Sequence, residues 1–376
     1  MAQYVTVADA FVPARGYWEP DHPVLDVLRS RRDSGSLPGA RTDGARVALA
    51  VEGGGMRGVV SAAMLCQLED HGFKDAFDVV YGCSAGGING AYFLAGNTWY
   101  SLSIYYDDLT TRRFVDFSRA LRQKPILNLD YSFDYVMERV KPLDYAAVIS
   151  AATRLAVPIT DVDGLRTVVL RDFASKAELK AALRASAWLP IAVPGTARTP
   201  QGGRAVDGGV LTALPFRLAL DDGCTHVLSL STRPMRERAG GSTSLMHRYT
   251  YLYLERLRPG LGRGYLAAIR QKYRDQEWLR AQRHPSGGAG PYVLDLAPLP
   301  WMPELKRHEM DRHVLLEHAR TAYETAFCAL EDRPVSLLAQ GRIHAIPRLT
   351  VVETANGAPR SNARSGAHGP ARPDRP

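Results

Sequence analysis

Long apolar runs, a recognisable leader and paired cysteines are all missing from this 376-residue chain. No run of about 20 apolar residues occurs, which argues against a helix that spans a bilayer. The first nine residues lack a basic stretch and a continuous apolar stretch, so no secretory signal is visible. The four cysteines form no C-x-x-C pair, which favours unpaired thiols in a reducing compartment. We therefore expect a cytoplasmic protein, with export through other signals left open.

The composition is that of an ordinary soluble globular protein, with 45% apolar and 23% charged residues. The chain is long enough to bury a large core. Its formal net charge of +8 is local rather than general. Residues 233–283 hold twelve Arg or Lys and four Asp or Glu, an excess of eight that equals the net charge of the whole chain. The rest of the protein is therefore electrically balanced.

Two strand–turn–helix passages follow one another in residues 46–91, and the second contains the pattern G-x-S-x-G. The pattern places Ser84 between Gly82 and Gly86, with a short apolar run before it and small residues after it. This context is typical of a nucleophile elbow, in which a strand and a helix nearly collide and side chains at the glycine positions would block the turn. The positive end of the following helix favours negative charge near the serine oxygen.

The first passage contains the glycine pattern Gly53-x-Gly55-x-x-Gly58, which has two interpretations. A dinucleotide site requires an acidic residue about 20 positions later, at the end of a second strand. Asp75 and Asp78 are near that distance, but they precede or begin a strand. An oxyanion hole, built from converging backbone N–H groups, explains the serine as well. We favour the oxyanion hole.

A serine nucleophile needs a partner that accepts its proton, and histidine is the usual one. The histidines here are uninformative, because His71 precedes the serine and His226 and the later ones lie in no glycine-rich loop. Asp207 is more conspicuous, because it stands on a tight turn with Gly208 and Gly209 directly after a short apolar strand.

With this aspartate, the chain resembles the patatin-like phospholipase family. The family combines a G-x-G-x-x-G loop, a G-x-S-x-G elbow and an aspartate in D-G-G or D-G-A, and all three occur here in that order. Residues 185–194 also match an Ala-Ser-x-x-x-Pro block that precedes the aspartate. The likeness covers residues 46–232. One departure is Ala213, where relatives often carry Asn, and it puts a supporting hydrogen bond to the aspartate loop in doubt.

The resemblance implies that Ser84 is the nucleophile and that Asp207 accepts its proton, without histidine. It implies an oxyanion hole whose core is the amides of Gly54 and Gly55, within the set Gly53, Gly54, Gly55, Arg57 and Gly58. Free aspartate has a pKa of about 4, too low for an efficient base at neutral pH. We therefore predict that Asp207 is desolvated, which raises its pKa.

The implied fold is a three-layer α/β/α arrangement around a mostly parallel central sheet, with a helical C-terminal region. The implied function is a serine lipid acyl hydrolase of the phospholipase A or lysophospholipase type, acting on a lipid or acyl ester without cofactor or metal. Two alternatives remain open: a carboxylesterase for small soluble esters, and a catalytically silent lipid-binding protein.

We expect four segments along the chain. Residues 1–45 form an N-terminal extension with a short helix, and residues 46–232 form the catalytic domain. Residues 233–352 form a mainly helical basic region with a last strand at 343–352, and residues 353–376 form a disordered tail. The aromatic segment 99–141 either lines an acyl groove or packs in the core.

The basic region contains two amphipathic stretches, residues 245–257 and 265–279, in which tyrosines and Trp278 alternate with arginines. Such stretches suit peripheral contact with an anionic membrane surface. Alternatively, they are the solvated faces of helices that pack on the catalytic domain. Nucleic acid is not expected, because no binding motif accompanies the charge.

Overall fold

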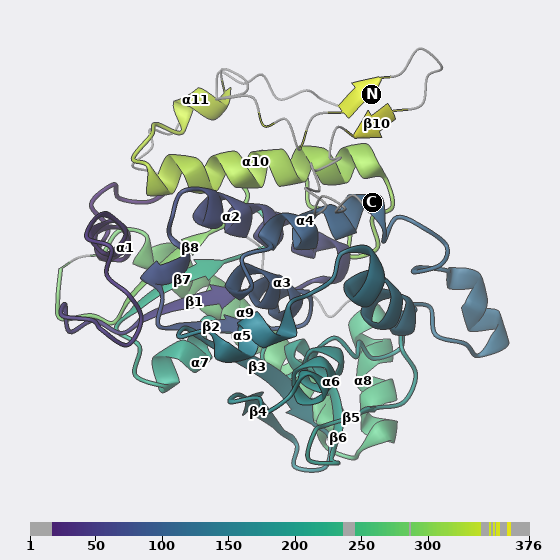
Figure 1. Ribbon diagram of the computed structural model, residues 1–376. Helices are drawn as coiled ribbons and strands as arrows, with labels where there is room; N and C mark the ends of the chain where they lie inside the picture. Colours follow the sequence, from purple (N-terminus) through teal and green to yellow (C-terminus); the bar gives the residue numbers. More distant parts are fainter. Residues whose placement is uncertain are drawn as a thin grey trace, which may run out of the picture.

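The computed structural model of the protein describes residues 17–235, 245–285, 287–339, 346, 349, 351–353 and 359–361. Its centre is an eight-stranded sheet (Figure 1) with the order β5-β6-β3-β2-β1-β7-β8, and β4 pairs with β3 outside this path. The strands are β1 (Val47–Val51), β2 (Val79–Gly82), β3 (Arg154–Asp161), β4 (Arg166–Leu170), β5 (Ala197–Arg198), β6 (Arg204–Asp207), β7 (His226–Leu230) and β8 (Tyr292–Leu296).

The helices cover both faces of this sheet. They are α1 (Pro23–Asp33), α2 (Gly58–Asp70), α3 (Ala85–Leu94), α4 (Thr98–Asp107), α5 (Tyr145–Ser150), α6 (Lys176–Ser186), α7 (Phe216–Asp221), α8 (Leu245–Leu257), α9 (Leu261–Gln282), α10 (Arg312–Leu330) and α11 (Ser336–Ala339). Short 3-10 turns are η3 (Gly55–Arg57), η4 (Lys74–Ala76), η5 (Phe117–Arg122) and η7 (Gly208–Val210), and η6 (Tyr131–Val140) is a π-helix. No helix of the described residues is long and apolar enough to cross a bilayer.

The alternation of side chains along β1 shows how the three layers form. Val47, Leu49 and Val51 point into the larger core with α1, α2, α3 and α10, whereas Ala48 and Ala50 point into a second core with α7 and α9. Strands buried on both faces have continuous apolar sequences, as β1 does. Figure 1 shows α2, α4 and α10 stacked on one side of the sheet and α7 on the other. The predicted three-layer α/β/α fold is confirmed.

The strands around β1 are parallel: β2 and β7 flank it, β3 follows β2, and β8 follows β7. Strand β1, helix α2 and strand β2 form a βαβ unit, because β1 and β2 pair in parallel. The other end of the sheet is antiparallel, because β4 and β6 both run against β3. Strands β3 and β4 form a hairpin.

The C-terminal region supplies one strand that the sequence analysis missed. It contains helices α8, α9 and α10 as expected, but β8 extends the central sheet beside β7. Asp295 interrupts the apolar run of β8, which hides the strand in the sequence. In the region predicted as a last strand, β9 (Val351–Glu353) pairs with β10 (Pro359–Ser361). Most of the tail predicted to be disordered, and residues 1–16 of the N-terminal extension, lie outside the described residues.

Candidate active site

The turn that carries Ser84 joins β2 to α3 and has a strained backbone. Ser84 adopts φ 55° and ψ −127°, a left-handed conformation that is rare for a residue other than glycine. A Cβ atom at Gly82 would lie 2.5 Å from the carbonyl oxygen of Gly86, and one at Gly86 would collide with the carbonyl oxygen of Val51. Strand and helix are therefore as close as the nucleophile-elbow pattern predicts.

Ser186 at the end of α6 links this turn to β3. Its Oγ accepts a hydrogen bond of 2.9 Å from the backbone N–H of Ser84. The same hydroxyl donates to the carbonyl oxygen of Pro158 at 2.7 Å. Ser186 belongs to the Ala-Ser-x-x-x-Pro block of residues 185–194, and the sequence analysis assigned no role to this serine. Its observed contacts show that it holds the strained turn against the sheet.

Asp207 reaches Ser84 because of the register of β3. Tyr81 of β2 pairs with Ala156, and Asp207 of β6 pairs with Ile159, further along the same strand. Strand β2 ends at Gly82, and β6 enters from the opposite direction to pair with the rest of β3. The end of β6 therefore meets the turn that follows β2. The two predicted catalytic residues, far apart in sequence, come together there.

The Asp207 carboxylate is buried and hydrogen-bonded. Only 5% of the residue is exposed, and its Oδ1 accepts the N–H of Gly209 at 2.7 Å. The Ser84 hydroxyl also lies within hydrogen-bonding reach of the Asp207 side chain. Burial raises the pKa of Asp207 above its usual value, while these two contacts act in the opposite direction. Asp207 is buried as predicted, and this burial raises its pKa in the predicted direction.

The aspartate loop is held by backbone contacts. Thr160 Oγ1 donates to the carbonyl oxygen of Asp207 at 3.0 Å, and the N–H of Thr212 donates to the carbonyl oxygen of Gly208 at 2.9 Å. A Cβ atom at Gly208 would collide with the carbonyl oxygen of Pro158, so only glycine fits at this position. These bonds support the aspartate loop, which is followed by Ala213.

The glycine loop between β1 and α2 lies against the serine turn. A Cβ atom at Gly53 would lie 2.9 Å from the Cβ of Ser84. Gly54 and Gly55 have φ angles of 149° and 62°, which favour glycine. Among the described residues, the N–H groups of Gly53, Gly54 and Gly55 find no hydrogen-bond acceptor. Donors left open beside a serine are what an oxyanion hole requires. Gly58, at the start of α2, packs against Ala85 and Tyr105.

Comparisons with known proteins show what this chain is similar to. Residues 49–220 match the family model for patatin-like phospholipases. This segment belongs to the patatin-like phospholipase family. Over 195 residues the chain is 27% identical to the uncharacterized protein YjjU of Escherichia coli strain K12, covering 50% of this chain. It spans about half the length of that relative, 52%. The solved structure of VipD from Legionella pneumophila aligns with a TM-score of 0.42 at 11% identity, covering 77% of this chain and 67% of that one.

A buried ion pair lies beneath the glycine loop of the patatin-like segment. Glu52, directly before Gly53, is 3% exposed, and its Oε1 accepts a 2.7 Å bond from Lys272 Nζ of α9. Its Oε2 accepts bonds from the N–H and Oγ1 of Thr232 at 2.7 and 2.9 Å. Burial opposes the ionisation of Glu52, but the nearby cations outweigh it and lower its pKa. Burial lowers the pKa of Lys272 to about 8, so it remains mostly charged at neutral pH.

Arg57, which the resemblance includes in the oxyanion-hole set, lies beside the same loop. Its guanidinium is buried against Gly54 and lies 3.5 Å from Oε1 of Glu304. The same carboxylate oxygen lies 3.1 Å from Nε of Arg233. Burial, together with the neighbouring arginines, lowers the pKa of Arg57 to about 9. Arg57 therefore supplies positive potential at the loop at neutral pH.

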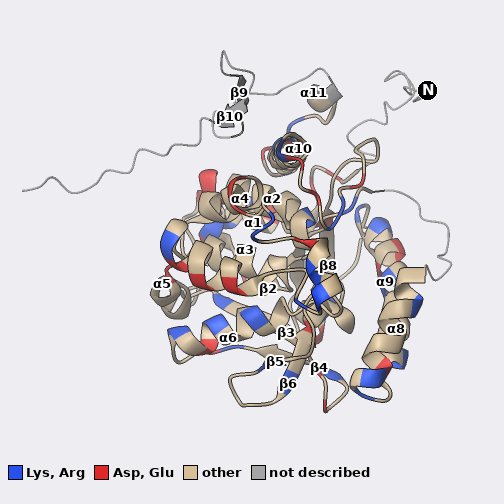
Figure 2. Ribbon diagram, turned by 90° about the vertical axis from the view of Figure 1, so that its right-hand side faces the viewer, with Lys and Arg blue, Asp and Glu red and all other residues tan. Residues whose placement is uncertain are grey.

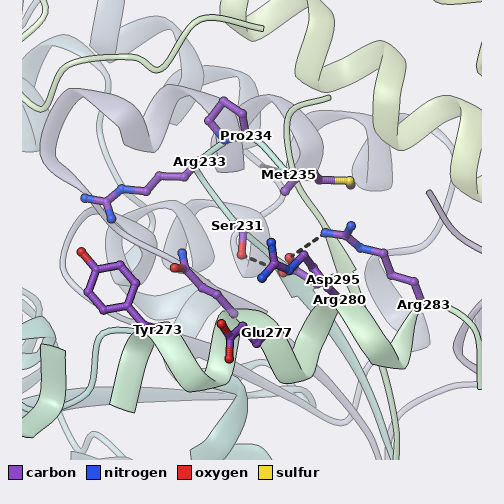
Figure 3. Close-up of a pocket in the computed structure, with 11 residues that line it drawn as sticks. Ser231, Arg233, Pro234, Met235, Tyr273, Glu277, Arg280, Arg283 and Asp295 are labelled. Carbon is purple, nitrogen blue, oxygen red and sulfur yellow. Dashed lines mark hydrogen bonds and ion pairs between the residues drawn. The ribbon is translucent and has the colours of Figure 1, made fainter. Parts of the chain in front are cut away.

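A small cavity lies beyond the carboxyl ends of β7 and β8, along α9 (Figure 3). In it Ser231 Oγ donates to Oδ1 of Asp295 at 2.7 Å, and Arg283 lies 3.9 Å from the other oxygen of that carboxylate. Its volume is about 50 Å³, enough for a few water molecules and too small for an acyl chain. Neither Ser84 nor Asp207 lines it. We do not assign this cavity to the substrate.

Sequence reasoning missed Glu52, Lys272, Thr232 and Ser186. Glu52 directly follows a buried strand, and a buried carboxylate requires a cation or hydrogen-bond donors nearby. The position of Glu52 therefore indicated that it has such a partner. Nothing in the sequence identifies that partner, because Lys272 is 220 positions away and is one of twelve cations in its region.

Proposed function

We propose that this protein is a serine lipid acyl hydrolase of the phospholipase A or lysophospholipase type, which works through a Ser–Asp dyad. One observation carries the proposal: the hydroxyl of Ser84 lies within hydrogen-bonding reach of the buried carboxylate of Asp207, beside a loop with open N–H groups. Membership of the patatin-like phospholipase family implies a lipid acyl ester as substrate. The dyad, the reaction steps and the substrate class within that family are our inference.

In the first step, the Ser84 oxygen attacks the carbonyl carbon of the ester while its proton passes to Asp207. The carbonyl oxygen gains negative charge and accepts hydrogen bonds from the amides of Gly54 and Gly55. Collapse of this intermediate expels the alcohol, which takes the proton from Asp207 and leaves an acyl group on Ser84. In the second step, water loses a proton to Asp207 and attacks the acyl-enzyme, and Ser84 recovers its proton as the fatty acid leaves.

The surroundings of the dyad support this assignment. The strained elbow presents Ser84 at the N-terminus of α3, whose positive dipole end favours developing negative charge. The buried Arg57 adds to that potential from the other side of the loop. The raised pKa of Asp207 makes its carboxylate a better proton acceptor than free aspartate.

The first prediction concerns covalent labelling of Ser84. A fluorophosphonate probe should modify the wild type at this residue, because an activated serine attacks phosphorus as it attacks a carbonyl carbon. Ser84→Ala should show no labelling, whereas Ser34→Ala, at an exposed serine distant in sequence, should be labelled as the wild type is. In-gel fluorescence and mass spectrometry of the modified peptide provide the readout. An unlabelled wild type, or a label on a different serine, would contradict the proposal. Rates on short soluble and long aggregated esters then distinguish a lipid hydrolase from a carboxylesterase.

We also propose that α8 makes peripheral contact with an anionic membrane surface. Its residue Leu254 is buried in an apolar cluster with Val206 and Val210, beside the aspartate loop. Its outer side exposes large apolar residues next to Arg248 and Arg256. The exposed fractions are 85% for Leu245, 64% for Met246, 58% for Tyr249 and 52% for Leu252. Figure 2 shows the cations along α8 and α9 at one flank of the molecule.

The second prediction tests this surface with vesicles. Leu245→Ser combined with Leu252→Ser should weaken binding to vesicles that contain anionic phospholipid by about tenfold, because two apolar side chains no longer enter the interface. Leu37→Ser is a matched control, because Leu37 is 56% exposed and does not belong to α8. Co-sedimentation at increasing salt measures both the apolar and the electrostatic contributions. If binding depends neither on anionic lipid nor on these leucines, the exposed face of α8 is only a solvated surface.

A further inference from the structure

Residues 112–128, which we call the arm, project from the body of the molecule. In Figure 1 this blue segment extends past the other helices at the right-hand side. Val115 forms a β-bridge with Leu127, and this bridge closes the base of the arm. The N–H of Asp116 also donates to the carbonyl oxygen of Ile126 at 3.0 Å. The 3-10 turn η5 therefore stands on a paired base, which fixes its direction.

The tip of the arm exposes large apolar side chains although its backbone is ordered. The side chain of Asp116 accepts the N–H of Ser118 at 2.9 Å and so caps η5. Phe117 is 57% exposed, and Leu121 is 89% exposed. Phe114 at the base, by contrast, is buried in the main core. Packing within the protein therefore explains Phe114 but leaves most of Phe117 and Leu121 facing water.

Cations surround these apolar side chains. The protein outside residues 233–283 is balanced overall, but residues 112–124 contain five Arg or Lys and one Asp. Arg112, Arg122 and Lys124 are exposed. An amphipathic surface of this kind suits an anionic bilayer, because apolar side chains enter the acyl boundary while cations remain with the anionic headgroups. Charge complementarity therefore favours an anionic lipid surface over a second copy of this basic chain.

The base of the arm is joined to the segment that precedes the aspartate loop. The N–H of Leu127 donates to the carbonyl oxygen of Ala192 at 3.1 Å. In the same segment, the carbonyl oxygen of Trp188 accepts the N–H of Asp207 at 2.9 Å. One short stretch of chain therefore holds both the arm and the proton acceptor of the proposed dyad.

The tip of the arm contacts the chain next to the glycine loop. The rings of Phe117 and His308 meet edge to face, with their centroids 5.4 Å apart. The carbonyl oxygen of the preceding residue, Arg307, accepts the N–H of Met56 in the glycine loop at 3.0 Å. The arm is therefore attached next to both loops of the candidate active site, and a lipid surface that receives its tip is brought close to Ser84.

We propose that the arm inserts Phe117 and Leu121 into an anionic lipid surface and so brings the dyad to acyl esters that are aggregated in that surface. This inference rests on the proposed acyl-hydrolase function and adds a docking element to that site. The contact proposed for α8 rests on other residues, so the two surfaces can be tested separately. A short ester dissolved in water reaches the dyad by diffusion and gains nothing from the arm.

A dye attached to the tip tests the insertion directly. The four native cysteines are buried, so Leu121→Cys supplies a single exposed thiol for an environment-sensitive nitrobenzoxadiazole label. In the Ser84→Ala background, its fluorescence should rise and shift to the blue on vesicles of phosphatidylcholine with phosphatidylserine, and change much less on phosphatidylcholine alone. A label on Leu37→Cys, at an exposed leucine outside the arm, should not respond. No response at position 121, or equal responses at both positions, would overturn the proposal.

A rate comparison separates docking from chemistry. Leu121→Ser should lower the rate on a long-chain ester in anionic vesicles, relative to the rate on a short soluble ester, by about tenfold, because one leucine no longer enters the interface. Leu37→Ser should leave this ratio unchanged. An unchanged ratio in Leu121→Ser would contradict the proposal. Insertion of the label without hydrolysis of either ester by the wild type would instead reject the proposed function and leave the arm as a lipid-docking element.

Discussion

Asp207→Asn is expected to lower kcat/KM for an acyl ester by about 10²–10⁴-fold, the usual contribution of a general base. Asparagine has the same shape and can keep the hydrogen bond from Gly209, but it accepts no proton from Ser84. Burial raises the pKa of Asp207 above 3.8, and only the ionised carboxylate can act as a base. Wild-type activity should therefore decrease as the pH falls through that raised pKa and remain on a plateau above it. A pH–rate profile of both proteins measures these effects.

The stability of the same variant provides the control. Because the pKa of Asp207 is higher in the folded protein than in the unfolded chain, its ionised form is disfavoured by folding at neutral pH. Removal of the charge should leave the melting temperature equal or higher, so lost activity cannot be attributed to unfolding. An activity limb at a pH of about 6.5, together with inactivation of one His→Ala variant, would replace the dyad with a histidine-based triad.

Lys272→Met is expected to lower the free energy of unfolding by about 3 kcal/mol, because it leaves Glu52 buried without its closest cation. Both partners are nearly inaccessible to solvent, with exposed fractions of 8% and 3%. The glycine loop begins at the next residue, so phosphonate labelling of Ser84 should also slow. Urea unfolding measures the first effect, and the rate of label incorporation measures the second.

Two further variants show whether the charge itself is responsible. Glu52→Gln combined with Lys272→Met removes both charges and should recover much of the lost stability. Lys176→Met breaks an ion pair with Glu138 in which the lysine is 57% exposed, and it should change stability by less than about 1 kcal/mol. Equal losses from Lys176→Met and Lys272→Met would contradict the assigned importance of the buried pair.

The parts of the site that sequence reasoning located are those set by local backbone requirements. Gly82 and Gly86 are needed because strand and helix touch, and Gly54 and Gly55 adopt positive φ angles. Such requirements leave a pattern within a few residues of the chain. The contact between Ser84 and Asp207 could be expected only from the resemblance, because it depends on which edge of β3 is free to pair with β6.

The parts that were missed depend on distant pairing. Lys272 is indistinguishable in sequence from the other cations of a basic region, and only the packing of α9 gives its side chain a partner. The predicted domain boundary after residue 232 omitted β8, because a buried charge at Asp295 interrupts its apolar pattern. When a side chain contacts a residue that is distant in sequence, the residues adjacent to it in the chain give no indication of that contact.

The contacts that hold the glycine loop limit where two such proteins can be joined to make a chimera. One side of that loop rests on a lysine from α9, and the other touches the carbonyl oxygen of Arg307, so both supports come from the second half of the polypeptide. If the segment up to β7 were fused to an unrelated C-terminal segment, the edge of β7 that pairs with β8 would be unpaired. Glu52 would also be buried without the lysine that neutralises it. Chimeras between relatives should succeed only when the crossover leaves α9, β8 and residues 304–307 with the half that they support.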